Sequence, residues 1–306
     1  MSTNQPVLLE ADLPLKLFAR GKVRDTYDLG EQLLIVATDR ISAYDSVLPC
    51  GIPGKGMVLN QLSRFWFERT ADIIPHHLIA SVDDVSSLDN YIPAAERFDY
   101  PDYLASRAMV VKKAERLPVE CVVRGYLSGS AWAEYKKEGT VFDLPLPEGL
   151  QEGEELPMLL FTPTTKEESG HDQPMGMDDM RQTMGEYIAE ELMEKTLAIY
   201  SYARKYASER GIIIADTKME FGLVGGKLIL IDEVLTPDSS RFWDIEKYRV
   251  GQAQASFDKQ PVRDWLVASG WNKEPPAPIL PPEVIAATTE RYVAAYERLT
   301  GKKLAV

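Results

Sequence analysis

The sequence predicts an α+β fold with mainly antiparallel sheets, on three observations. Short apolar stretches joined by tight turns fill the first part of the chain, a two-glycine hairpin lies in the second part, and the segments with helical periodicity lie mostly late. The chain has 306 residues, of which 45% are hydrophobic and 26% charged. This composition is typical of globular proteins, and the length suits about two domains of roughly 100–200 residues.

The charge balance and the cysteines exclude several classes of protein. Lys and Arg number 34 against 47 Asp and Glu, a formal net charge of −13, so nucleic acid would be repelled and an anionic ligand needs a local basic cluster. Cys50 and Cys121 form no metal-binding pattern and lie far apart, which favours a reducing compartment. No apolar run approaches the ~18 residues of a membrane span, and no leader pattern opens the chain, so we expect a cytoplasmic protein without membrane contact.

The first half of the chain is predicted to be rich in strands. Apolar stretches bounded by turn residues predict strands over residues 24–30, 31–39, 105–115 and 118–126. Apolar residues near helical spacing predict a helix over residues 59–74, which Pro75 ends. From Leu144 to Gly176 the chain is rich in Pro, Gly and acidic residues and predicts a long loop, which in compact domains is often functional.

The second half is predicted to combine helices with a hairpin. Residues 177–211 place apolar side chains on one face and predict one long helix, or two joined near Gly185, with Gly211 as the cap. The apolar run 212–216 predicts a buried strand, and a hairpin is expected on either side of the two glycines, over residues 218–224 and 228–234. Helices are expected over residues 258–269 and 283–303, separated by a stiff proline segment.

The segment GKVRDTY, residues 21–27, is a candidate phosphate-binding element. Lys22 and Arg24 lie two residues apart and face one side of a strand, while Gly21 lets the backbone approach a phosphate closely. The Walker A pattern is absent from the sequence. Taken alone, the segment is therefore better explained as a solvated basic hairpin edge.

The segment IIIADTKMEFG, residues 212–222, is more informative. An apolar strand runs directly into Asp216, Lys218 and Glu220, which alternate and so share one face. Three charges beside a core are costly unless they pair with one another or bind a ligand. A binding site is therefore expected here, with a structural ladder of ion pairs as the alternative.

The hairpin register decides which residue opposes Glu220. A two-residue turn at Gly225 and Gly226 places Glu220 opposite Ile231, whereas a three-residue loop places it opposite Asp232. We favour the three-residue loop, since Gly226 permits its left-handed position. Glu220 and Asp232 would then form a Mg²⁺ site that nucleotide phosphates and water complete.

Three other segments carry polar residues at the end of an apolar stretch. Residues 117–132 and 230–244 each combine serine hydroxyls with an arginine, a pairing that suits a phosphate or carboxylate, although an ordinary Pro-Asp turn explains the second equally well. Residues 38–45 end a strand with acids, an arginine and a serine, and on spacing alone they fit a capped helix start.

The histidines form no metal-binding pattern. His76 and His77 are adjacent and expected on the surface, and His171 lies with Asp172 in the long loop. Neither a GxSxG nor a GxGxxG motif occurs, so the signatures of serine hydrolases and dinucleotide enzymes are absent and phosphate chemistry remains.

Six segments, in order, resemble the phosphoribosylaminoimidazole-succinocarboxamide synthase (SAICAR synthetase) family: GKVRDTY, TDRISAYD, LPVECVVRGYLSGS, FTPTTKEESGHD, IIADTKMEFG and DEVLTPDSSRFW. The resemblance runs from about residue 18 to the C-terminal helix and is greatest to the long monofunctional form of yeasts and some bacteria. It implies an ATP-dependent ligase of purine biosynthesis that joins L-aspartate to carboxyaminoimidazole ribotide (CAIR), giving SAICAR, ADP and phosphate.

The resemblance also implies a two-lobed cleft like that of protein kinases or ATP-grasp enzymes. A sheet-rich nucleotide-binding lobe would span residues 1–118, and an α+β lobe with the ribotide and Mg²⁺ sites would span residues 119–306. Only small-molecule partners are implied, with no nucleic acid or membrane, and the chain would be a monomer or a small homo-oligomer.

Roles carried over from the resemblance fall into groups. ATP would contact Lys22, Arg24 and Lys112, with Lys113 as a rival for Lys112, and adenine would be held by backbone groups of Glu120 and Val122. The ribotide phosphate would be bound by Arg124, Ser130 and Arg241, and Mg²⁺ by Glu220 and Asp232. Substrate would be placed by Asp39, Arg40, Ser42, Lys166, His171 and Asp172.

Two residues would act at the reaction centre. A carboxylate is a poor electrophile, so a route through an acyl phosphate is expected, in which stabilisation of charge is the main task. Lys218 would offset charge on the phosphoryl group, and Asp216 would assist deprotonation of the amine. A small-molecule or protein kinase is an alternative, although the HRDxxxxN and DFG motifs are absent, and a non-catalytic purine-nucleotide binder is another.

Overall fold

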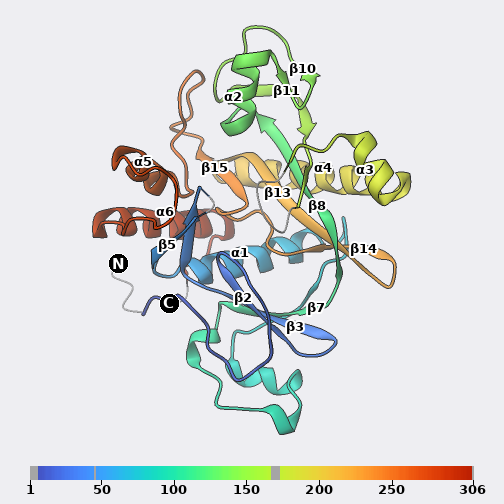
Figure 1. Cartoon of the computed structure of the whole chain (residues 1–306), viewed down its shortest axis with the longest axis vertical. Helices are drawn as coiled ribbons and strands as arrows, with labels where there is room; N and C mark the ends of the chain where they lie inside the picture. Colours follow the sequence, from blue (N-terminus) through green and yellow to red (C-terminus); the bar gives the residue numbers. More distant parts are fainter. Residues whose placement is uncertain (1–5, 45, 167–172, 305–306) are drawn as a thin grey trace.

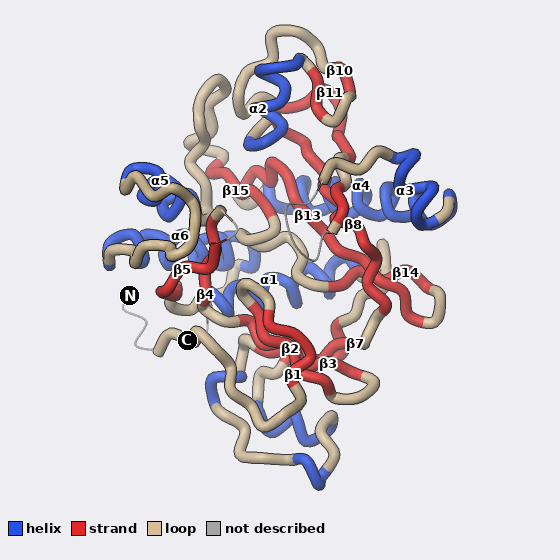
Figure 2. Tube along the Cα trace, viewed as in Figure 1, coloured by secondary structure: helices blue, strands red, loops and turns tan. Residues whose placement is uncertain are grey.

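The computed structural model describes residues 6–44, 46–166 and 173–304. It contains two larger antiparallel sheets with helix α1 (Lys55–Thr70) between them, as Figure 1 shows. The mixture of helices and antiparallel strands confirms the predicted α+β class (Figure 2). None of the helices within the described ranges is both long and apolar enough to span a membrane.

The first sheet has the strand order β1-β2-β3-β7-β6. Its strands are β1 (Leu17–Arg20), β2 (Arg24–Asp28), β3 (Gln32–Ala37), β7 (Ala108–Lys112) and β6 (Leu78–Ser81). Successive side chains of β3 point to opposite faces of the sheet, and both faces are packed. Leu34 and Val36 are buried in a cluster below the sheet, while Ile35 packs toward the main core. Three short 3₁₀ segments, Val85–Asn90, Ala94–Glu96 and Asp102–Leu104, cover the lower face.

The second sheet has the order β11-β8-β13-β14, with β12 also paired to β8 and β15 to β13. Its strands are β8 (Glu115–Tyr126), β11 (Glu155–Phe161), β12 (Thr164–Thr165), β13 (Ile212–Val224), β14 (Lys227–Ile231) and β15 (Ser240–Asp244). The predicted loop from Leu144 to Gly176 is therefore wrong in part, because its apolar residues 155–161 pair with β8. Two short pairs complete the strands: β4 (Arg40–Ala43) with β5 (Ser46–Gly51), and β9 (Thr140–Val141) with β10 (Leu144–Pro145).

The helices that the sequence predicts are present with shifted ends: α1 lies four residues before its predicted range of 59–74. Residues 177–208 form α3 (Met177–Met184) and α4 (Glu186–Ser208), separated at Gly185, whose φ of 83° interrupts the helix. Helix α4 covers the second sheet opposite the cleft, ends before Gly211, and has Glu209 rather than glycine at its C-cap. The other helices are α2 (Gly129–Glu138), α5 (Gln260–Ala268) and α6 (Pro282–Thr300), the last starting at Pro282 and ending at Gly301 as expected. Residues 38–45 do not begin a helix, since β4 starts at Arg40.

Strand β13 contains a bulge between Ile214 and Asp216. Before it, Ile212 and Ile214 face the core beneath α4; after it, Met219 and Phe221 do so. Because of the extra residue, even-numbered side chains face the core before the bulge and odd-numbered side chains face it after the bulge. The sequence predicted two separate strands here, whereas the structure has one continuous strand. As a result Asp216, Lys218 and Glu220 all face away from the core, as their spacing predicts.

The two sheets are joined in two places. The chain crosses from β7 to β8 through residues 113–114, so the predicted division between residues 118 and 119 lies within β8. A second connection is the segment 75–77: the Leu230 amide donates to the Pro75 carbonyl at 2.9 Å, and the His77 amide donates to the Leu230 carbonyl at 3.0 Å. The His77 carbonyl also accepts from the Lys112 amide at 2.8 Å. This seam, residues 75–77, binds β14 of one sheet to β7 of the other.

The C-terminal helices pack back on the first part of the chain. Val262 and Leu266 of α5 share a buried cluster with Ile41 and Ile52 beside the β4–β5 pair. Tyr296 of α6 donates to the Gln61 side chain of α1 at 2.9 Å. Helix α6 thereby packs against α1.

Helix α1 approaches β3 too closely for any side chain at Gly56. A Cβ built on Gly56 would lie 2.2 Å from the backbone oxygen of Ala37. We expect Gly56→Ala to lower the free energy of unfolding by about 1–3 kcal/mol, as overpacking does, measured by urea denaturation. The control is Gly176→Ala, where the nearest atom is the flexible Asp179 carboxylate at 3.4 Å. Equal stability of the two variants would contradict the close approach.

Candidate functional site

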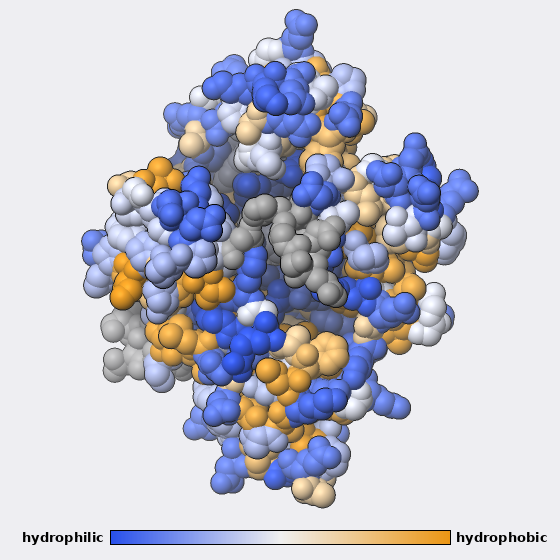
Figure 3. Space-filling model, in the orientation of Figure 1, coloured by the Kyte–Doolittle hydropathy of each residue, from blue (hydrophilic) through white to orange (hydrophobic). Residues whose placement is uncertain are grey.

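A cleft of about 1220 Å³ lies between the two sheets. The first sheet contributes Lys22, Arg24 and Lys112, and the second contributes charged residues of β8, β13 and the end of β14. Figure 3 shows a hollow in the middle of this face whose described residues are mainly hydrophilic. Cavities for one small ligand usually measure roughly 300–1,000 Å³, so this cleft is large enough for a nucleotide.

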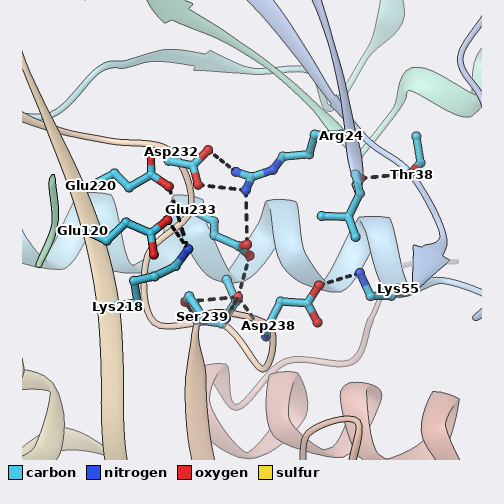
Figure 4. Close-up of polar contacts among 12 residues, drawn as sticks. Arg24, Thr38, Lys55, Glu120, Lys218, Glu220, Asp232, Glu233, Asp238 and Ser239 are labelled. Carbon is cyan, nitrogen blue, oxygen red and sulfur yellow. Dashed lines mark hydrogen bonds and ion pairs between the residues drawn. The ribbon is translucent and has the colours of Figure 1, made fainter. Parts of the chain in front are cut away.

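Two glutamates of neighbouring strands meet two lysines in this cleft. Glu120 of β8 lies opposite Glu220 of β13, and their side chains are each 8% exposed. Lys218 contacts Glu120 at 2.6 Å (Figure 4). Lys166 contacts Glu120 at 3.1 Å and also pairs with Glu220. Burial, followed by the nearby Asp232 charge, raises the pKa of Glu220. The carboxylates thus form a buried acidic site with its own lysine counter-charges.

Asp232 joins this group by a route that the sequence did not predict. The hairpin has a two-residue turn, with Val224 opposite Lys227 and Glu220 opposite Ile231, so the three-residue register that we favoured is wrong. Tight two-residue turns match the twist of the strands, and both glycines have the positive φ that such a turn requires. Asp232 follows the last strand residue in a left-handed conformation, φ 62°.

Arg24 contacts the Asp232 carboxylate through both terminal nitrogens of its guanidinium group. The two contacts measure 2.6 and 2.8 Å, and a further contact to Glu233 measures 3.2 Å (Figure 4). Burial alone would raise the pKa of Asp232, but Arg24 and the lysines outweigh it and lower this pKa to about 2. Arg24 thereby ties the first sheet to the acidic site.

A second cavity of about 240 Å³ adjoins the cleft. It gathers Arg124, Ser130 and Arg241, the three residues expected to bind the ribotide phosphate. Asp216 accepts from Arg241 at 2.5 Å, from Ser128 at 3.3 Å and from Arg124 at 3.5 Å. Lys218 lines both cavities.

A buried charge cluster supports the turn between the two cavities. Asp238 pairs with Lys55 at 2.7 Å and with Lys259 at 3.6 Å, and it accepts from the Tyr292 hydroxyl. Lys55 is fully buried, and desolvation lowers its pKa although Asp238 opposes that shift. Desolvation would raise the pKa of Asp238, but Lys259 and Lys55 hold it well below its usual range. The cluster connects α1, α6 and the turn after β14.

Some expected site residues have structural partners instead. Asp39 is buried, pairs with Arg107 at 3.1 Å and accepts from the Gly56 amide at 2.9 Å. Arg40 pairs with Asp25 at 2.8 Å and donates to backbone carbonyls around the β1–β2 turn. These contacts hold the first sheet together, and the expected role of Asp39 and Arg40 in placing substrate stays a prediction.

The other expected residues divide between the cleft and its surroundings. Ser42 and Lys166 line the larger cleft, and His171 and Asp172 lie outside the described residues. Lys112 lines the cleft, whereas Lys113 pairs with Asp28 at 3.0 Å.

Backbone groups of Glu120 and Val122 lie within the second sheet. The Val122 carbonyl accepts from the Thr162 amide at 2.9 Å, and Glu120 pairs with both Thr164 and Glu220. Glu120 lines the larger cleft and Val122 lines the smaller cavity, and the expected contact of their backbone groups with adenine stays a prediction.

Sequence reasoning missed His77. This side chain was expected on the surface but is 3% exposed and lines the cleft beside Asp232. Burial lowers the pKa of His77 to about 3, so the ring is neutral at physiological pH. The one available signal was its place between apolar residues in IIPHHLIA, which no spacing rule connects to Asp232.

The fold and the site together define an enzyme class. Two sheets enclose a cleft with lysines, arginines and paired carboxylates, and an adjoining anion pocket shares Lys218 with it. Such a site suits transfer of a phosphoryl group between two bound anions.

The comparisons with known proteins identify the family. The family profile described as SAICAR synthetase matches residues 17–278. Phosphoribosylaminoimidazole-succinocarboxamide synthases of Syntrophobacter fumaroxidans and Thermodesulfovibrio yellowstonii are each 52% identical to this chain, covering 99% and 96% of it and 99% of the relative. The SAICAR synthase of Saccharomyces cerevisiae, solved as a complex with SAICAR, has a TM-score of 0.88 at 42% identity, covering 98% of this chain and 100% of that one.

The chain belongs to the SAICAR synthetase family. It is therefore a ligase of purine biosynthesis that uses ATP and acts on small-molecule substrates. The resemblance seen in the six sequence segments is confirmed over nearly the whole chain.

The charge cluster around Asp238 allows a stability test. Asp238→Asn leaves the buried Lys55 without its nearest counter-charge, and we expect a loss of about 3–5 kcal/mol in urea denaturation. Adding Lys55→Met should recover much of this loss, because the buried cation is then gone. Lys137→Met, at an exposed ion pair with Glu138, serves as the control and should change stability little. A double variant that loses the sum of both single effects would contradict the pairing.

Proposed function

We propose that this ligase joins L-aspartate to the carboxylate of CAIR through an acyl phosphate, with ATP in the larger cleft and the ribotide in the smaller cavity. The observation that carries the proposal is the position of Lys218, which lines both cavities. A phosphoryl donor in one cavity and a carboxylate acceptor in the other would meet beside this ammonium group. Its charge suits the developing charge of the transfer.

The proposed reaction has two steps. The CAIR carboxylate attacks the γ-phosphorus of ATP, the bond to the β-phosphate oxygen breaks, and ADP leaves. The aspartate amine then attacks the acyl carbon, phosphate leaves, and the nitrogen loses its proton to give the amide of SAICAR. The protein contributes positioning and charge stabilisation to both steps.

We assign the phosphates of ATP to Lys22, Arg24 and Lys112, which approach the cleft from the first sheet. Phe18, Leu33 and Ile35 line the same cleft and provide apolar surface for a purine base. We assign the contribution of Glu120 to its carboxylate, which orients Lys218 and Lys166, and we retain Ser42 and Lys166 as substrate-placing residues.

Glu220 and Asp232 suit a magnesium ion. Their hard oxygen donors lie close together, with Glu220 buried and Asp232 half-buried, and Arg24 and Lys166 balance their charge. Within the described ranges no group of three or more metal-ligating side chains occurs, which agrees with the usual binding of Mg²⁺ by one or two carboxylates together with phosphates. Bound there, Mg²⁺ would neutralise charge on the phosphates of ATP.

The ribotide phosphate is assigned to Arg124, Ser130 and Arg241 in the smaller cavity. A guanidinium fork beside a hydroxyl suits a phosphate monoester. The yeast relative was solved with SAICAR, which supports binding of the same class of ligand here.

The direct test is ADP release from the purified enzyme with ATP, Mg²⁺ and CAIR, with and without L-aspartate, while SAICAR is followed by absorbance. We expect stoichiometric ADP and SAICAR only when all components are present. Steady ADP release without aspartate would favour a kinase, and no release at all would favour a non-catalytic nucleotide binder.

Arg241 provides a test of the ribotide site. Its side chain borders the smaller cavity and touches none of the residues assigned to ATP. We expect Arg241→Ala to raise the KM for CAIR at least tenfold and the KM for ATP less than twofold, measured by initial rates. Arg181→Ala, at an exposed arginine of α3, is the control. Equal rises in both KM values would refute this assignment.

Asp216 has two candidate roles, which a single substitution can distinguish. Its contacts with Arg241 and Arg124 support a role in orienting these arginines, whereas the expected role as a base for the amine requires a free oxygen at the reaction centre. If Asp216 orients the arginines, Asp216→Asn should slow phosphorylation of CAIR and amide formation by similar factors in single-turnover experiments. Loss of amide formation alone, with acyl phosphate still produced, would identify Asp216 as the base.

A further inference from the structure

The three cations of the acidic site are attached to the fold in different ways. Arg24 lies in β2 and Lys218 in β13, and each of these strands is paired with a neighbour on both sides. Lys166 instead follows Thr165, the last residue of β12, and its amide donates to the Pro118 carbonyl at 3.2 Å. The backbone of Lys166 is thus held at one point, while its flexible four-carbon side chain lets the ammonium group move.

The ammonium group of Lys166 makes the contacts that a bound cation would make. It contacts Glu120 at 3.1 Å and also pairs with Glu220. Lys218 contacts Glu120 at 2.6 Å but lies 4.0 Å from Glu220. Of the two lysines, Lys166 is therefore the closer to Glu220, which is one of the two carboxylates assigned to the metal.

The charges of the acidic site are already nearly balanced by the protein. The contacts join four carboxylates and three cations: Glu120, Glu220, Asp232 and Glu233, with Arg24, Lys166 and Lys218. A divalent ion alone would add two positive charges to these cations, at a place where burial strengthens their repulsion. The phosphates of a nucleotide would supply the compensating negative charge.

We propose that the Lys166 ammonium is a displaceable counter-ion that excludes free Mg²⁺ from Glu220, so that the metal binds as its nucleotide complex. The inference deepens the proposed function and rests on the assignment of the metal to Glu220 and Asp232. Once displaced, the ammonium can pair with a phosphate oxygen, which keeps its own charge compensated.

The test measures Mn²⁺ binding to the full chain by electron paramagnetic resonance, in which the signal of the free ion falls as the ion binds. Mn²⁺ prefers the same oxygen ligands as Mg²⁺. Without nucleotide, we expect Lys166→Met to bind Mn²⁺ about tenfold more tightly than the parent protein, because one contacting positive charge is gone. Lys166→Gln should show the same gain. With ADP present, the advantage of both variants should disappear, because the lost ammonium no longer pairs with a phosphate.

Lys112→Met is the matched control. Lys112 lines the same cleft, but its ammonium contacts the His76 carbonyl at 3.3 Å. Without nucleotide, this variant should bind Mn²⁺ within about twofold of the parent protein, since screening weakens the effect of a charge that does not contact the site. Adding Glu220→Gln to Lys166→Met should remove the gain, which locates the bound ion.

The outcomes separate this inference from the proposed function. An unchanged Mn²⁺ affinity in Lys166→Met, an equal gain in Lys112→Met, or a gain that survives Glu220→Gln would overturn the role of Lys166. Near-ultraviolet circular dichroism checks the fold of each variant, and Lys166→Gln decides if Lys166→Met fails to fold. If Glu220→Gln and Asp232→Asn both bind Mn²⁺ with ADP as the parent protein does, the assignment of the metal fails first, and the inference with it.

Discussion

The arrangement of the site depends on keeping several carboxylates charged beside an apolar core. Glu120 and Glu220 are buried between the sheets and Asp232 is half-buried beside them, and burial of unpaired charges is strongly unfavourable. Lys166, Lys218 and Arg24 supply the opposite charges, and they come from different parts of the fold. The two sheets are therefore held at a separation at which these charges meet, and the same separation leaves room for an anionic substrate.

Local sequence patterns predicted several features of the fold and of the site. The alternation of Asp216, Lys218 and Glu220 placed three charges on one face, and Gly185 and Pro282 correctly marked helix boundaries. The gathering of Arg124, Ser130 and Arg241 followed from the six family segments, since spacing alone did not connect β8 with β15. Periodicity and capping act over a few residues, so they survive without knowledge of the fold.

The misinterpreted features all depend on contacts between distant segments. Asp39 and Arg40 are buried in ion pairs with Arg107 and Asp25, which the spacing of TDRISAYD does not reveal. The burial of His77 has no local signal, because its amide bonds Leu230 and its ring packs against Phe67. Strand β11 lacked a readable period because its partner β8 supplies the reason for its conformation.

The bulge in β13 has a consequence for how this chain can vary. The two faces of the strand are set by counting residues from the bulge, so loss of the one extra residue would carry Met219 and Phe221 into the cleft and Glu220 into the core. A substitution in β13 alters the contacts of one side chain. An insertion or deletion instead reverses which side chains face the core along the rest of the strand. Natural and designed relatives should therefore tolerate insertions and deletions in the loops around residues 145–155 far more readily than at residues 214–216.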